Sequence, residues 1–221
     1  MAVEEDRSGT EARSFLACAA EVARLLGIED TAPVPEEPEE RRARYLAHAV
    51  RKPLLERAVL PEDAFAALMA AAVHDPDPSF CRWFVEPALY VFGRRRVLAA
   101  LVDRMRTGSD AERAGAVRAW YCAHLPLSAD RSPAYAPGGS RDPALDECRD
   151  VVDSWLEESM RVFARSTDPQ TRLRVLLNLP AARAAYPQHL HELLDHTIVS
   201  ARTHPSEHIR RWGAVAERHG A

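Results

Sequence analysis

Apolar residues recur along most of this chain at steps of three and four positions, which is the period of an amphipathic α-helix. The first such stripe contains Phe15, Val22 and Leu26 and ends before Gly27, a residue that commonly terminates helices. The pattern predicts a helix over residues 11–26.

The period is interrupted by an acidic stretch that contains three prolines, so residues 11–40 are predicted to form the first helix and a solvated linker. Residues 1–10 are polar and acidic, and we expect them to be disordered. Residues 41–221 are predicted to form a single helical domain. The prolines and glycines at 126–143 predict a loop inserted into that domain.

Helical stripes recur throughout the predicted domain, whereas β-branched residues are sparse, so the chain is expected to be all-α with about nine to ten helices. One of these helices follows Ser109 and Glu112, whose spacing predicts a capping box. Its small residues lie on one side, where another helix could approach closely: Ala111, Gly115, Ala119 and Cys122. The other predicted helices lie near 41–55, 61–73, 79–92, 94–107, 144–165, 169–179, 187–202 and 205–218.

Two helix starts resemble each other within the chain. Asp168-Pro169 is followed by Arg174, and His204-Pro205, which begins 36 residues after Asp168, is followed by Arg210. A period of about 36 to 40 residues with two helices in each repeat is typical of an α-solenoid, in which neighbouring hairpins share one core.

These repeats resemble the HEAT and armadillo-like family of α-helical repeats. The resemblance covers residues 75–218, and a diverged third copy begins at Asp110, where Ala116 stands in place of the arginine. It implies a right-handed α-solenoid of stacked antiparallel hairpins. It also implies that Asp168, Arg174 and Arg210 are structural residues in a ladder between repeats. Such a resemblance names no ligand.

Charge changes this picture locally. The chain has 29 basic and 33 acidic residues, a net charge of -4, yet residues 82–118 contain eight arginines and four acidic residues. Guanidinium groups bind carboxylates and phosphates, so Arg94, Arg95, Arg96 and Arg118 are candidate contacts for a ligand or partner. The alternative is that these arginines form an ordinary solvated helix face.

No catalytic, cofactor-binding or metal-binding residue is predicted. His189, Glu192 and His196 share one helix face, but the absence of a fourth ligand favours a polar stripe. The four tryptophans lie among apolar residues at helical spacing, which favours core packing. The four cysteines are widely spaced, which argues against a zinc ribbon or a disulfide framework, and we expect buried, reduced thiols.

The sequence therefore favours a non-catalytic scaffold that binds a protein or peptide, either an acidic partner or the chain's own acidic residues 29–40. An alternative is nucleic-acid binding, because some HEAT-like proteins are alkylpurine DNA glycosylases. A third hypothesis is a homodimer formed through an uncapped end of the solenoid. One lysine against 28 arginines suggests a GC-rich bacterial genome. The lack of a signal peptide or an apolar span leads us to expect a cytoplasmic protein with no membrane partner.

Overall fold

The computed structural model describes residues 15–28, 38–57, 59–127 and 147–219. Within these residues every regular element is a helix, which confirms the predicted all-α class. The predictions for the N-terminal ten residues and for most of the acidic segment and of the loop insertion lie outside the described residues. The predicted end of the acidic linker at residue 40 is wrong, because Glu39 and Glu40 form the first turn of α2.

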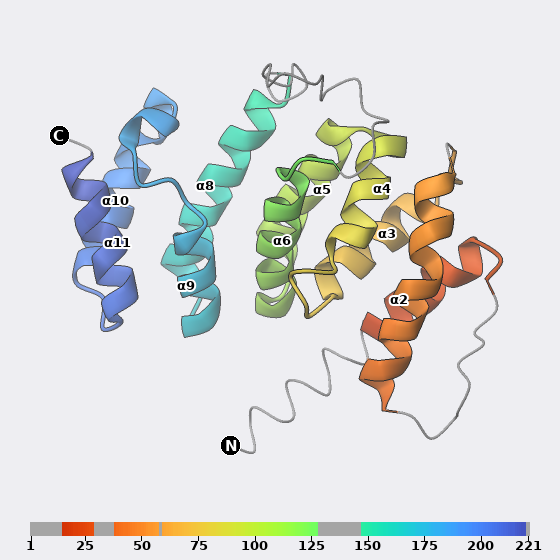
Figure 1. The fold of residues 1–221 in the computed structure, drawn as a ribbon. Coiled ribbons are helices and arrows are strands. Elements are labelled where there is room, and N and C mark those ends of the chain that lie inside the picture. Colours follow the sequence, from red (N-terminus) through yellow and green to blue (C-terminus); the bar gives the residue numbers. More distant parts are fainter. Residues whose placement is uncertain (1–14, 29–37, 58, 128–146, 220–221) are drawn as a thin grey trace.

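The helices follow one another along the chain as Figure 1 shows. The first described helix covers residues 15–25. It is followed by α2 (Glu39–Glu56), α3 (Ala64–His74), α4 (Arg82–Phe92), α5 (Arg94–Thr107), α6 (Asp110–Ala123), α8 (Arg149–Arg165), α9 (Pro169–Leu177), α10 (His191–Arg202) and α11 (Glu207–Arg218), with short 3-10 turns at Arg183–Ala185 and Gln188–Leu190.

Local residue chemistry sets several of these helix ends. Gly27 adopts a φ of 69°, and the next amide, of Ile28, donates to the Ala23 carbonyl at 2.9 Å, which is the hydrogen bond of a Schellman motif. Ser109 and Glu112 form the predicted capping box at the start of α6. The predicted start of a helix at Pro61 is wrong, because residues 62–63 form a turn before α3 begins.

Three consecutive hairpins, α5–α6, α8–α9 and α10–α11, pack in two rows. The first helices of the hairpins contact one another in the order α5, α8, α10, and the second helices do so in the order α6, α9, α11. Helix α3 extends the second row by packing on α6, while α4 contacts α3, α5 and α6, and α2 contacts α4. The apolar face of each hairpin is therefore covered by its neighbours.

The core runs along the seam between these rows in two clusters that meet at α8 and α9. Trp120 of α6 and Trp155 of α8 stack with ring centroids 4.1 Å apart and nearly parallel planes. Trp120, Trp155 and Trp212 are buried, as predicted, whereas Trp83 is half-buried. Stacked aromatic rings add specific attraction to the area that they remove from water, so this pair ties two adjacent hairpins together.

The predicted close approach of a helix to the small face of α6 is confirmed at Gly115. A Cβ atom on this residue would lie 1.9 Å from the Val73 carbonyl oxygen of α3. Only glycine lets the two backbones come this close. In the described part of the chain, no helix is both long and apolar enough to span a membrane.

Candidate functional site

The four arginines predicted to contact a partner all donate to groups of the chain itself. Arg94 is buried and hydrogen-bonds the carbonyl of Ala123 at the end of α6. Arg118 donates to the carbonyl of Asp75, after the end of α3, at 3.0 Å. Both side chains therefore satisfy carbonyls at helix C-termini.

The two remaining arginines of this group make ion pairs. Arg95 forms two hydrogen bonds with the Asp150 carboxylate of α8, at 2.8 and 2.6 Å. Arg96 pairs with Glu62 and lies over the ring of Phe65 at 4.2 Å. The contacts made by the four arginines join neighbouring helices, and they do not bring the four side chains together around one pocket. Their role in partner binding stays a prediction.

Two of the three residues implied by the family resemblance contact backbone groups at their own helix starts. The Asp168 carboxylate accepts a hydrogen bond from the Thr171 amide at 2.8 Å, which caps α9. Arg210 donates to the carbonyls of His204 and Pro205 at 2.8 and 2.6 Å. Arg174 is exposed on α9. The Thr171 hydroxyl lies 2.8 Å from the Asp168 carboxylate and 3.3 Å from the backbone carbonyl of Asp110 in the preceding hairpin. The ladder between repeats stays a prediction.

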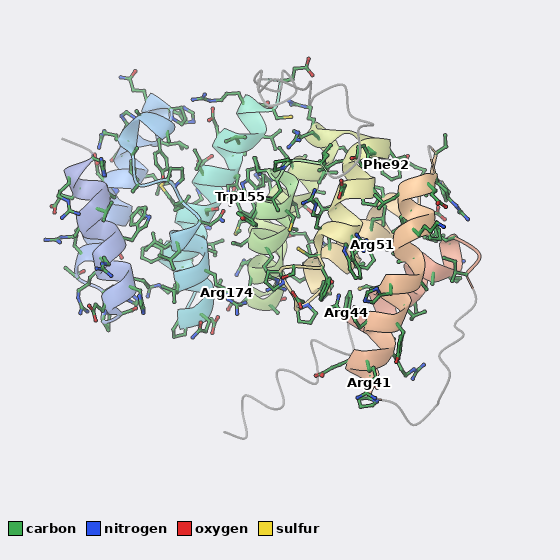
Figure 2. The ribbon with its side chains drawn as sticks, in the orientation of Figure 1. Arg41, Arg44, Arg51, Phe92, Trp155 and Arg174 are labelled. Atoms are coloured by element: carbon green, nitrogen blue, oxygen red, sulfur yellow. The ribbon has the colours of Figure 1, made fainter. Side chains whose placement is uncertain are left out.

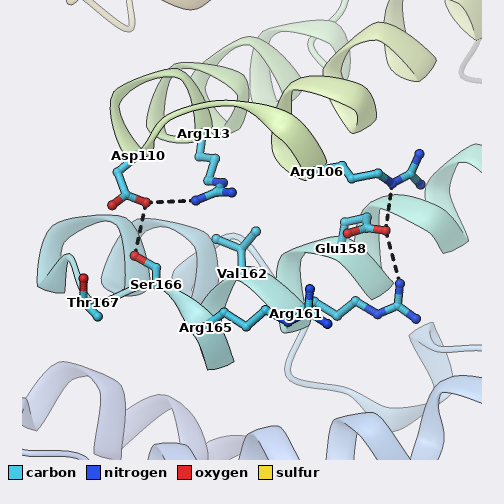
Figure 3. A pocket seen from close by; sticks show the side chains of 9 residues that line it. All are labelled: Arg106, Asp110, Arg113, Glu158, Arg161, Val162, Arg165, Ser166 and Thr167. Carbon is cyan, nitrogen blue, oxygen red and sulfur yellow. Dashed lines mark hydrogen bonds and ion pairs between the residues drawn. The ribbon is translucent and has the colours of Figure 1, made fainter.

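A cavity of about 240 Å³ lies where the first of the three hairpins meets the second (Figure 3). Helices α5 and α6 form one wall, and the C-terminal half of α8 with the turn after it forms the other. We call it the arginine pocket, because its charged lining consists of four arginines and two carboxylates: Arg106, Arg113, Arg161, Arg165, Asp110 and Glu158.

The floor of the arginine pocket holds a buried carboxylate. The Glu158 side chain is 8% exposed. One of its oxygens accepts hydrogen bonds from Arg106 Nε at 3.0 Å and from Arg161 Nη1 at 3.3 Å. A buried carboxylate needs such partners to offset its loss of hydration. Glu158 therefore holds one guanidinium from each wall at the pocket, as Figure 3 shows.

A second acidic group fixes the opposite end. Asp110, the first residue of α6, accepts from Arg113 Nη1 at 3.2 Å and from the Ser166 hydroxyl at 3.2 Å. Arg113 also donates through Nε to the Met105 carbonyl at 3.2 Å. These contacts restrict the rotamers of Arg113 and bring the turn after α8 against the start of α6, which preorganises this end of the pocket.

The fourth arginine, Arg165, is exposed one turn after Arg161 on the same face of α8. Among the residues that the structure describes, no carboxylate lies within ion-pair distance of Arg165. Four guanidiniums with five N–H donors each face two carboxylates in this lining, and Arg161 also pairs with Glu157, outside the lining, at 2.6 Å. The arrangement can bind an anion through charge-assisted hydrogen bonds.

Sequence reasoning missed this pocket because its arginines are far apart in the chain. Arg106 and Arg113 lie within the basic segment 82–118 but are not among the four arginines predicted to contact a partner. The spacing of Arg161 and Arg165 places both on one helix face and was a signal that could have been used. Nothing in the sequence indicates that this face of α8 lies opposite α5 and α6.

Among the described residues, no three His, Cys, Asp or Glu side chains lie close enough together to bind a metal ion.

Comparison with protein-family models, with curated proteins and with solved structures found no match to this chain.

Proposed function

We propose that this protein is a HEAT-like, right-handed α-solenoid that acts as a binding scaffold, and that its arginine pocket binds an acidic peptide segment of a partner. The solenoid is supported by the two rows of successive hairpins and by the 36-residue offset between similar helix starts. A solenoid presents an extended surface on which a peptide can lie across adjacent repeats.

The observation that carries the binding proposal is the charge of the pocket lining. Four arginines surround the cavity, and only two carboxylates line it with them. Asp110 and Glu158 already accept hydrogen bonds within the pocket, while Arg165 is exposed on α8 and has no ion-pair partner among the described residues. A carboxylate-bearing ligand would complete this set of donors with bidentate geometry.

An acidic peptide fits these features better than a nucleic acid does. Duplex DNA carries a negative charge about every 1.7 Å along its axis, and proteins match it with a broad basic face. Here the net charge of the chain is -4, and the four arginines of the proposed site surround one cavity of about 240 Å³. Such a cavity admits a carboxylate side chain and leaves the rest of the peptide on the surface.

The test is the affinity of the full chain for a fluorescein-labelled oligoglutamate peptide, followed by anisotropy at low and physiological ionic strength. The test variant is Arg106→Gln with Arg165→Gln, because Arg161 still pairs with Glu158 when Arg106 is lost. The control is Arg24→Gln with Arg51→Gln, which removes the same charge from two exposed sites on the N-terminal helices.

Loss of two charge-assisted hydrogen bonds is expected to weaken peptide binding by a factor of about 10 or more in the test variant. The control is expected to bind within about twofold of the wild type, because an exposed charge outside the site contributes little. Equal losses in both variants, or no binding at low salt, would contradict the proposal. Tighter binding of a short DNA duplex than of the peptide would favour the nucleic-acid alternative.

A further inference from the structure

Two cysteines that are far apart in the sequence meet in the core. Cys81 directly precedes α4, and Cys122 lies in the last turn of α6. Their Sγ atoms are 3.1 Å apart, although 41 positions separate them in the chain, and both are free thiols. Nothing in the sequence indicates this pair, since neither cysteine belongs to a short motif.

The surroundings of the pair are fixed by the fold. Both residues are buried, with exposed fractions of 0% for Cys81 and 3% for Cys122. The carbonyl of Pro78 lies 3.5 Å from the sulfur of Cys81 and 3.7 Å from that of Cys122. Helices α4 and α6 pack directly against each other. The two sulfur atoms are therefore held side by side by the packing of the core.

We infer that Cys81 and Cys122 are a reversible oxidation site, at which hydrogen peroxide converts the two thiols into an intramolecular disulfide between α4 and α6. A disulfide bond is about 2.05 Å long, so the sulfur atoms need to approach by only about 1 Å. Side-chain rotation and a small shift of the end of α6 can supply this movement. The inference is independent of the proposed peptide binding.

The reaction balances with peroxide as the two-electron oxidant. The Cys122 thiolate attacks one peroxide oxygen, the O–O bond breaks, and the departing hydroxide takes up a proton to become water, which leaves a sulfenic acid on Cys122. The sulfur of Cys81 then attacks the Cys122 sulfur and displaces hydroxide, which takes the Cys81 proton and becomes the second water. Two thiols and one peroxide thus give one disulfide and two waters.

The electrostatics of the pair assign these roles. The pKa of Cys122 is lowered by the hydrogen bond from Cys81 and by the nearby charge of Arg82. The pKa of Cys81 is raised by its hydrogen bond to Cys122 and by burial. Cys122 is also the less deeply buried of the two and lies near Arg82, so we assign it as the nucleophile and Cys81 as the resolving thiol. The burial of both favours a small, neutral oxidant over a bulky disulfide.

The experiment uses the full chain, reduced and then exposed to hydrogen peroxide. After catalase removes the peroxide, the protein is unfolded in N-ethylmaleimide and analysed by mass spectrometry, whole and after digestion. The expected product is a monomer in which the peptides of Cys81 and Cys122 are joined, with a mass about 2 Da below the sum of the two reduced peptides. Dithiothreitol before alkylation is expected to restore both thiols.

Two variants make the result specific. Cys18→Ser with Cys148→Ser keeps the pair and is expected to form the same disulfide, whereas Cys81→Ser is expected to form none and to carry sulfenic acid on Cys122. Full alkylation of both cysteines in the peroxide-treated wild type would overturn the inference. A disulfide that involves Cys18 or Cys148, or one that joins two chains, would also overturn it.

Discussion

At the scale of single residues, the clearest structural role belongs to Asp75, which is fully buried after α3. Its carboxylate accepts two hydrogen bonds from the guanidinium of Arg44 of α2, at 2.8 and 3.1 Å. Arg44 also lies over the ring of Phe80 at 4.4 Å. This bidentate pair ties α2 to the turn between α3 and α4.

Asp75→Ala is expected to lower the free energy of unfolding by about 3 kcal/mol, because Arg44 then loses its partner in a largely buried site. Urea denaturation measures this change. The matched control is Glu21→Ala, which removes an exposed carboxylate paired with Arg24 and is expected to leave the free energy of unfolding nearly unchanged. Similar losses for the two variants would contradict the assigned role of Asp75.

A second residue-scale effect concerns two histidines that the fold keeps neutral. Burial lowers the pKa of His124 below 6.5, and its Nδ1 lies 2.8 Å from the Trp120 carbonyl oxygen, so that nitrogen carries the proton of the neutral ring. Burial and the charge of Arg172 lower the pKa of His204, whose Nδ1 accepts from the Ser206 amide at 3.0 Å and so must lack a proton.

The sign of the pH dependence follows from these shifts. Below pH 6.5 the unfolded histidines bind protons that the folded ones still resist, so the free energy of unfolding falls as the pH drops from 7.5 to 5.5. The stabilisation from Glu112 persists through this window, because hydrogen bonds from Ser109 lower the pKa of its carboxyl below 4.5. Urea denaturation at both pH values is expected to show a smaller fall for His124→Gln than for the wild type, and an equal fall would contradict this origin.

At the scale of elements, helix positions and several ends were predictable because they depend on local chemistry. The capping box of α6 and the glycine stop at Gly27 were both read from residues within one turn. Less local features were not predictable in this way. Helix α10 begins at His191 and not at the predicted Pro187, because Gln188–Leu190 form a 3-10 turn. Such a choice depends on how the turn packs against neighbouring helices.

The contact of α3 with α6 gives an element-scale prediction. Gly115→Ala is expected to lower the free energy of unfolding by about 2 kcal/mol or more, because the new methyl group collides with the backbone of Val73 and forces the helices apart. Thermal or urea unfolding measures the loss.

Gly213→Ala in α11 is the graded control for this change. Its nearest contacts would be 3.1 Å away, to the Ala201 side chain and the Arg202 amide nitrogen. The gain in helix propensity, about 1 kcal/mol, offsets part of this crowding, so we expect a smaller loss than for Gly115→Ala. A Gly115→Ala protein that is as stable as the wild type would show that the two helices do not need this close approach.

At the scale of the whole molecule, function depends on how neighbouring hairpins sit against each other. The arginine pocket exists because the C-terminal half of α8 lies opposite the end of α5 and the start of α6 (Figure 3). The hydrophobic pattern predicts the helices of both hairpins, and the arginines lie on them. The relative position of the two hairpins, however, is set by side-chain packing such as that of Trp120 on Trp155.

Tertiary packing also explains why the four predicted contact arginines do not line the arginine pocket. Arg94 lies at a helix start beside the carbonyl of Ala123, so tertiary packing uses its charge internally. Its neighbours Arg95 and Arg96 meet acidic residues of α8 and of the turn before α3. A side-chain view of the molecule shows charged groups distributed over all the helices (Figure 2). Local charge density therefore could not identify the pocket.

The measurement that tests the central proposal most directly is hydrogen–deuterium exchange of the full chain with and without saturating oligoglutamate peptide. A ligand in the arginine pocket is expected to slow amide exchange at residues 106–113 and 158–168, the segments that form its walls. Exchange at α2 and α11, which lie at the two ends of the described row of helices, is expected to stay unchanged. Protection confined to residues 94–96 or to α2, with no change at either pocket segment, would contradict the account.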